Sequence, residues 1–123
     1  MAYHHIDVEA IEPTPERPCT QRSLSDAAGL TQLGAHVYEV APGEQIPLAY
    51  HYHDQQEELF YVLSGTIAVE TPDETFSVGT DEAFAVEPES PQRASVPESA
   101  DGPARVLVVG APAVDDAHAY DGE

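Results

Sequence analysis

The sequence contains no lysine and no tryptophan, and its four basic residues, all arginines, face 23 acidic residues. The formal net charge is −19 at pH 7. A surface with this charge repels phosphate backbones, which argues against nucleic acid as a partner. Anionic membrane surfaces are disfavoured for the same reason. We therefore expect no nucleic acid and no membrane among the partners.

Cysteine and long apolar runs are also scarce. Cys19 is the only cysteine, so no intrachain disulfide can form. No stretch approaches the roughly 18–20 consecutive apolar residues that a membrane span requires. Residues 1–13 lack the basic and apolar regions of a secretory signal. These absences predict a cytoplasmic protein.

The acidity has two interpretations. It can belong to an ordinary soluble acidic protein, or it can be an adaptation to high salt, where counterions screen the repulsion between like charges. Acidity combined with the absence of lysine resembles proteins of extremely halophilic archaea. We therefore predict a halophilic protein whose stability increases with salt.

The 123 residues are enough for one domain with one core. From residue 34 onward, short strand-like segments alternate with Pro- and Gly-containing turns, and no segment has sustained helical periodicity. The expected strands cover residues 34–42, 48–53, 58–70, 74–78, 82–88, 92–96 and 105–112. Within 58–70 we expect a hairpin that turns at Ser64-Gly65. This pattern predicts an all-β sandwich or closed barrel.

We divide the chain into three parts. Residues 1–33 form an N-terminal segment with short strands, such as 4–8 and 17–25, that pack on the barrel. Residues 34–112 form the barrel, and residues 113–123 form an acidic arm or disordered tail. The expected strands at 58–63 and 106–109 are apolar on both faces, so their outer face needs a cover. A second copy of the chain is a reasonable cover, and we predict a homodimer.

The residues that carry chemistry are His51, His53 and Glu58. Two histidines at i and i+2 on a strand point to the same face, and Glu58 begins the next strand. Two histidines and one carboxylate form a typical facial site for iron, also usable by manganese, nickel or zinc. The alternative is an exposed His-Tyr-His on a strand edge that binds nothing.

The stretch HYHDQQEELFYVLSG, residues 51–65, resembles the first conserved motif of the cupin superfamily. Residues 79–93 resemble the second motif in length and apolar pattern, and the likeness covers about residues 34–110. The resemblance implies a single-domain cupin: an antiparallel β-barrel of the double-stranded β-helix or jelly-roll type. It also implies frequent dimerisation and a metal held inside the barrel by three histidines and a glutamate.

The second motif departs from this pattern at its histidine, which is replaced by Gln92. The Gln92 amide oxygen can complete the ligand set with His51, His53 and Glu58, or the side chain can position a water or a substrate. A vestigial site is the third alternative. The cofactor expected from the resemblance is a divalent transition metal: iron, manganese, nickel or zinc.

Two functions fit these residues. The first is a small metalloenzyme that acts on an oxygen-bearing small molecule, with the ion as Lewis acid or as activator of dioxygen. The second is a non-catalytic cupin that binds a metal or small ligand for sensing or storage, with a degenerate site. A small molecule is the expected partner in both cases, and the sequence assigns no catalytic residue.

Overall fold

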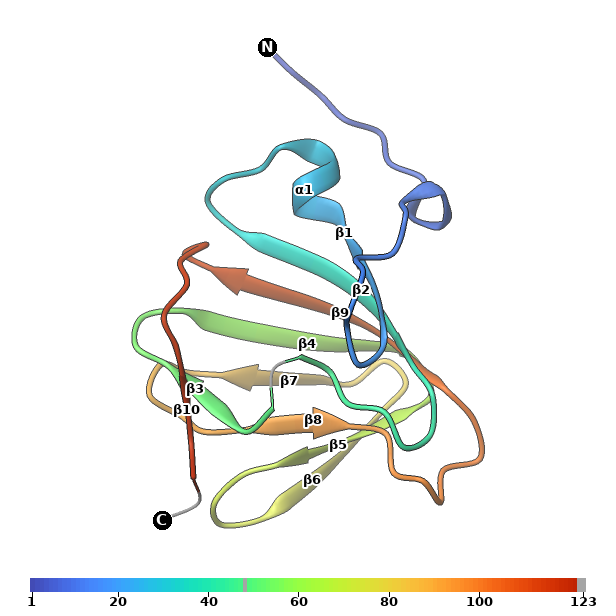
Figure 1. Ribbon diagram of the computed structural model, residues 1–123, viewed down its shortest axis with the longest axis vertical. Helices are drawn as coiled ribbons and strands as arrows, with labels where there is room; N and C mark the ends of the chain where they lie inside the picture. Colours follow the sequence, from blue (N-terminus) through green and yellow to red (C-terminus); the bar gives the residue numbers. More distant parts are fainter. Residues whose placement is uncertain (48, 122–123) are drawn as a thin grey trace.

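The computed structural model describes residues 1–47 and 49–121, and its strands form a barrel of antiparallel sheets (Figure 1). The elements in chain order are η1 (Val8–Ala10), β1 (Thr20–Ser23), α1 (Leu24–Ala28), β2 (Gly34–Val40), β3 (His51–His53), β4 (Glu57–Ser64), β5 (Thr66–Glu70), β6 (Thr75–Gly79), β7 (Ala83–Val86), β8 (Arg93–Ser95), β9 (Ala104–Ala111) and β10 (Ala117–Ala119). The predicted all-β antiparallel barrel is confirmed. Leu48, at the start of one expected strand, lies outside the described residues.

The barrel has one large sheet and two small ones. The five-stranded sheet has the order β1-β2-β9-β4-β7, the three-stranded sheet the order β6-β5-β8, and β10 pairs with β3. An isolated bridge between His51 and Gln92 links β3 to the segment that leads into β8. This bridge brings the end of the second cupin-like motif beside the beginning of the first.

The core lies between the sheets because buried and exposed positions alternate along the strands. In β9 every second residue from Ala104 to Gly110 is buried, and the residues between them are partly exposed. Phe60, Val62, Val69 and Val106 are almost completely removed from solvent. Each such side chain contributes about 1.5–3 kcal/mol through burial, so the core holds the two layers together.

The predicted hairpin within residues 58–70 is wrong. β4 pairs with β7 and β9, whereas β5 pairs with β6 and β8, so the chain passes from one sheet to the other at Gly65. Gly65 has φ +86°, and a Cβ there would lie 2.6 Å from the Pro103 carbonyl oxygen. The glycine therefore forms a tightly packed corner between layers, which has the same local sequence signal as a hairpin turn.

The N-terminal segment contains one strand and two short helices. β1 falls within the expected strand at 17–25 and pairs with β2. Residues 4–8 form no strand; the 3-10 helix η1 begins at Val8 instead. Helix α1 is capped by Ser23, whose side chain accepts a hydrogen bond from the Asp26 amide, and it ends at Gly29 with φ +69°. Local caps thus make a helix that is too short to show periodicity.

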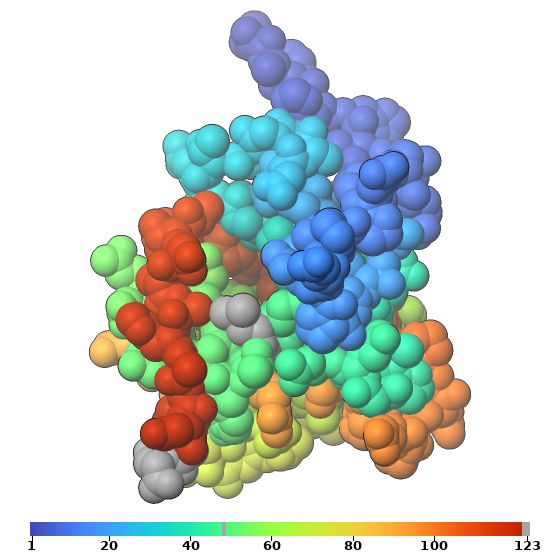
Figure 2. All heavy atoms as spheres, in the orientation of Figure 1, coloured from blue at the N-terminus to red at the C-terminus, as the bar shows by residue number. Residues whose placement is uncertain are grey.

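The C-terminal segment lies along the barrel as an arm. Its strand β10 pairs antiparallel with β3, with Ala117 opposite His53 and Ala119 opposite His51. In Figure 2 this arm (red) and the N-terminal segment (blue) occupy the same face of the molecule, with residues near 50 (green) between them. The arm therefore borders the strand that carries both candidate histidines.

The outer face of β4 is the apolar surface for which the sequence predicted a cover. Leu59, Tyr61 and Leu63 are 46%, 37% and 36% exposed, whereas Phe60 and Val62 on the inner face are buried. The described N-terminal segment leaves this surface open, and the homodimer stays a prediction. Within residues 1–47 and 49–121, no helix has the length and apolar character needed to cross a membrane.

Candidate metal centre

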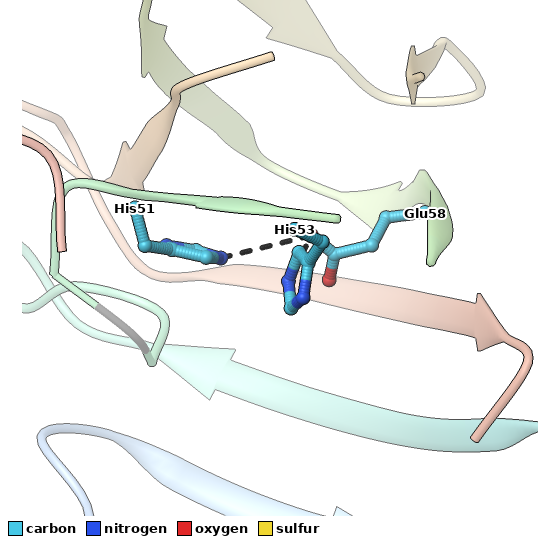
Figure 3. Close-up of side chains that lie close together, drawn as sticks. All are labelled: His51, His53 and Glu58. Carbon is cyan, nitrogen blue, oxygen red and sulfur yellow. Dashed lines mark ion pairs between the residues drawn. The ribbon is translucent and has the colours of Figure 1, made fainter. Parts of the chain in front are cut away.

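His51, His53 and Glu58 come together inside the barrel, as the sequence predicted. One ligand atom from each lies within 4.8 Å of the others. Glu58 Oε1 is 3.3 Å from His53 Nε2 and 3.8 Å from His51 Nε2. Figure 3 shows the two imidazoles and the carboxylate directed toward one another. Two ligands about 2.1 Å from one ion lie roughly 3.0–3.4 Å apart, so these separations are near those of a metal site.

His51 reaches this position from β3 and is 5% exposed. Its Nδ1 lies 2.7 Å from the Ala49 carbonyl oxygen. A carbonyl oxygen can only accept, so Nδ1 carries the proton and donates it. In the neutral ring, the Nε2 lone pair is then free and faces Glu58.

His53 is oriented in the same way by a carboxylate. Asp116 Oδ1 lies 2.8 Å from His53 Nδ1, and Asp116 Oδ2 accepts hydrogen bonds from the amides of Gln55 and Gln56. Burial raises the pKa of Asp116, but these hydrogen bonds outweigh it and hold the pKa at about 2. Asp116 is therefore ionised at neutral pH and accepts a hydrogen bond from His53 Nδ1. In the neutral ring the lone pair then lies on Nε2, which faces Glu58.

The two lone pairs and the carboxylate form a donor set that fits a divalent cation. Two imidazole acceptors and a negative oxygen repel one another unless a positive charge lies between them. A proton can supply part of that charge. Burial lowers the pKa of His51, but hydrogen bonding to Glu58 and Ala49 outweighs burial, so the net pKa is raised. The site thus favours a positive charge beside Glu58.

Gln92 lies in the same cluster, as the resemblance implied. It is 2% exposed, and its Nε2 is 3.3 Å from Glu58 Oε1. Its Oε1 is buried and has no hydrogen-bond partner among the described residues. An unpaired buried oxygen costs about 1–3 kcal/mol, so this amide is incompletely satisfied in the protein alone. A cation beside Glu58 favours the flipped amide, with Oε1 toward the ion.

The cluster opens into a cavity of about 130 Å³. Its wall includes His36 and Tyr38 of β2 and Gln56, besides the three clustered residues. His36 matches no ligand spacing in the sequence, so sequence reasoning did not place it at the site. His36 and Tyr38 share one face of β2 at i and i+2, and this period-two signal could have placed them beside the site once β2 was paired.

Asp116 was also missed by sequence reasoning. It lies 63 residues after His53 in an acidic segment, where no local pattern distinguishes it from Asp115. Only the pairing of β10 with β3 brings it to the histidine. His118, one position beyond Ala117, instead contacts Asp54 Oδ2 at 2.7 Å outside the cluster.

Comparison with known proteins agrees with this architecture. Residues 36–110 match the family model of the cupin domain. The chain is 32% identical over 83 residues to "Polyketide synthase CurC" of Streptomyces cyaneus. The aligned part covers 66% of this chain and 53% of that protein. The chain therefore spans about half the length of this curated relative.

Two solved structures are similar in fold. The polyketide cyclase RemF from Streptomyces resistomycificus has a TM-score of 0.79 and 22% identity, over 96% of this chain and 85% of that one. A sugar phosphate isomerase from Silicibacter pomeroyi has a TM-score of 0.80 and 24% identity, over 96% and 82%. With the matched family model and the barrel, these comparisons show that the chain belongs to the cupin superfamily.

Proposed function

We propose that the protein binds a divalent transition metal through His51, His53 and Glu58 and uses it to act on an oxygen-bearing small molecule. The observation that supports this most strongly is the orientation of the two imidazoles. Each Nδ1 is held by a fixed acceptor, so each Nε2 faces the Glu58 carboxylate and, in the neutral ring, carries the lone pair that can bind an ion. Such second hydrogen bonds are typical of metal-ligating histidines.

The surrounding residues give each group a role. His51 and His53 fix the geometry, and Glu58 contributes negative charge. A bound cation would polarise a carbonyl or hydroxyl oxygen of the ligand as a Lewis acid. Burial raises the pKa of Tyr38, with Cys19 and Glu58 adding to the effect, so its hydroxyl keeps its proton and can donate to a ligand in the cavity.

The chemical class of the ligand is supported by the curated relative. Its name refers to polyketides, which carry several carbonyl and hydroxyl oxygens. An oxygen-rich organic molecule is therefore the class that we propose for this protein. The metal is one of iron, manganese, nickel or zinc, since the two-histidine, one-carboxylate donor set accepts all four.

The test is metal stoichiometry measured by elemental analysis after loading and desalting. We expect about one ion per chain in the wild type and almost none in His51→Ala or Glu58→Ala. His5→Ala is the matched control, because His5 is exposed and lies in the N-terminal segment. Circular dichroism verifies that each variant folds. Wild-type occupancy in both site variants would contradict the proposed ligands.

A non-catalytic metal- or ligand-binding role is the second candidate, and Gln92 favours it. The amide replaces an imidazole, and an amide oxygen is the weaker ligand for a transition metal. The two candidates differ in turnover. A metal-loaded protein that binds oxygen-bearing compounds without converting any of them supports the binding role, whereas conversion that is lost in Glu58→Ala supports the enzyme.

A further inference from the structure

Three of the four arginines are paired with acidic side chains. Arg22 pairs with Glu39, Arg93 with Glu70 at 2.7 Å, and Arg105 with Glu9 at 3.2 Å. Arg17 forms no ion pair with any acidic residue that the structure describes. Arg17 is exposed, so N–H groups of its guanidinium can donate to an anionic ligand from solution.

Arg17 lines a cavity of about 440 Å³ between the N-terminal segment and the barrel. This volume is within the range of small-molecule sites. Part of its wall is apolar, formed by Pro18, Pro47 and Ala49. His36, Tyr38 and Pro47 also line the cavity beside His51 and Glu58, so the two cavities adjoin.

A chain of hydrogen bonds connects Arg17 to this boundary. Arg17 Nε donates to Gln21 Oε1 at 3.0 Å, and Gln21 Nε2 lies 3.3 Å from His36 Nδ1. A guanidinium can only donate, so the Gln21 atom facing it is the oxygen and the atom facing His36 is the NH2 group. His36 Nδ1 must then accept, which places the proton of the neutral ring on Nε2.

The neutral form of His36 agrees with its surroundings. Burial is the main cause that lowers its pKa; the charge of Asp26 opposes it, the charge of Arg17 adds to it, and Glu58 has a smaller opposing effect. A Cβ added to Gly34, another residue of the cavity beside His51, would lie 3.7 Å from His36 Nε2. His36 therefore presents an N–H donor toward that cavity, while Arg17 retains N–H donors for the larger one.

We propose that Arg17, Gln21 and His36 form a subsite for a carboxylate-bearing ligand, whose carboxylate binds Arg17 and whose opposite, oxygen-bearing end reaches the cavity of His51, His53 and Glu58. The guanidinium fork matches a carboxylate through two parallel hydrogen bonds. This assignment rests on the proposed function only for the second end of the ligand.

The charge of the site favours a monoanion over a dianion such as a phosphate monoester. Arg17 supplies one positive charge, His36 is a neutral donor, and Glu16 adds a carboxylate to the wall of the same cavity. The net charge of −19 also opposes a second negative charge on the ligand. The apolar wall suits the organic part of a carboxylic acid.

Glu16 itself has φ +59°. A non-glycine residue in this left-handed region is strained, and such residues cluster at ligand-binding sites. Here the strained residue directly precedes Arg17. Glu16 and Arg17 line the same cavity but form no ion pair with each other.

The experiment compares benzoate with its neutral analogue benzamide by isothermal titration at one fixed salt concentration and pH 7.5. Metal-free and metal-loaded full-length protein are both titrated. We expect benzoate to bind more tightly than benzamide in both forms. Arg17→Gln should weaken benzoate binding by about 10–100-fold, as expected for a lost charged hydrogen bond, and leave benzamide unchanged. Arg17→Lys should retain part of the preference.

Two control variants sharpen the result. Arg105→Gln removes an equal charge from a pair outside the cavity and should change neither affinity. Glu16→Gln removes the opposing carboxylate and should tighten benzoate binding. Thermal melting shows whether each variant folds.

Three results would overturn the subsite. The wild type could bind benzoate and benzamide equally well, it could bind neither, or Arg17→Gln and Arg105→Gln could have equal affinities for benzoate. Failure of the metal proposal is seen separately, because benzoate is also titrated into metal-free protein. Loss of metal binding with an intact preference for benzoate would contradict the proposed function alone.

Discussion

Two histidine–carboxylate pairs lie at the junction of β3 and β10, yet they have different surroundings. Each joins a histidine of one strand to an aspartate that directly flanks the other strand. His53 and Asp116 are 2.8 Å apart, and their side chains are 10% and 13% exposed. His118 and Asp54 are 2.7 Å apart, and their side chains are 48% and 55% exposed. The contact distances are nearly equal, so the histidine–carboxylate contact by itself does not distinguish the two pairs.

The difference lies in what the second ring nitrogen faces. His53 Nε2 faces Glu58 inside the barrel, where charges interact strongly because water is largely excluded. In the His118 pair, Nε2 is itself the nitrogen that contacts Asp54 in the exposed region, and the ring stacks on Tyr52. A carboxylate beside a histidine therefore predicts little until burial and the direction of the other nitrogen are known.

The largest expected effect tests burial itself, at Cys19. Burial, with a smaller contribution from the charge of Glu44, raises the pKa of this thiol to about 12. The reactive thiolate is favoured above the pKa, so at pH 8 the folded protein should contain about 1,000-fold less thiolate than the unfolded chain, whose pKa is near 9. Iodoacetamide labelling with and without denaturant measures this ratio, and equal rates would contradict it.

The next effect compares the two carboxylates directly. Asp116→Ala should weaken metal binding by about 10–100-fold, because His53 loses the partner that fixes its proton on Nδ1. Asp54→Ala is the matched control and should leave the affinity unchanged, since His118 does not face the cluster. A chelator competition titration gives both constants. Equal losses would show that the two pairs are equivalent after all.

A smaller change is expected at Gln92, inside the buried cluster. Gln92→His should tighten binding of nickel, cobalt or zinc by about tenfold, because imidazole is a better ligand for these ions than an amide oxygen. Gln92→Ala should weaken binding only modestly. The same competition titration compares the three proteins. If Gln92→His has the wild-type affinity, the side chain at this position does not reach the ion.

The smallest effect is expected at the exposed pair. His118→Ala should change the free energy of unfolding by about 1 kcal/mol or less, and this difference should shrink as salt rises. Over the same salt series, the wild-type melting temperature should rise, because screening reduces repulsion within a chain of charge −19. A flat melting temperature would count against the halophilic prediction.

Much of the fold was readable from the sequence because it is encoded locally. Short strand-like segments indicated strands such as β2, β4 and β9, and Pro- and Gly-containing turns separated them. The hairpin at Gly65 was wrong for an equally physical reason. A glycine with positive φ serves a hairpin and a corner between sheets alike, and only long-range strand pairing distinguishes them.

The sequence alone determined that His51 and His53 share one face of a strand, because the period of a strand is two. With the family resemblance, it also placed Glu58 and Gln92 near them. Only the tertiary structure brought Asp116, His36 and Arg17 to the same region, through the pairing of β10 with β3 and of β1 with β2. Residues far apart in the chain become neighbours through packing of the whole barrel, and local sequence carries no signal for that proximity.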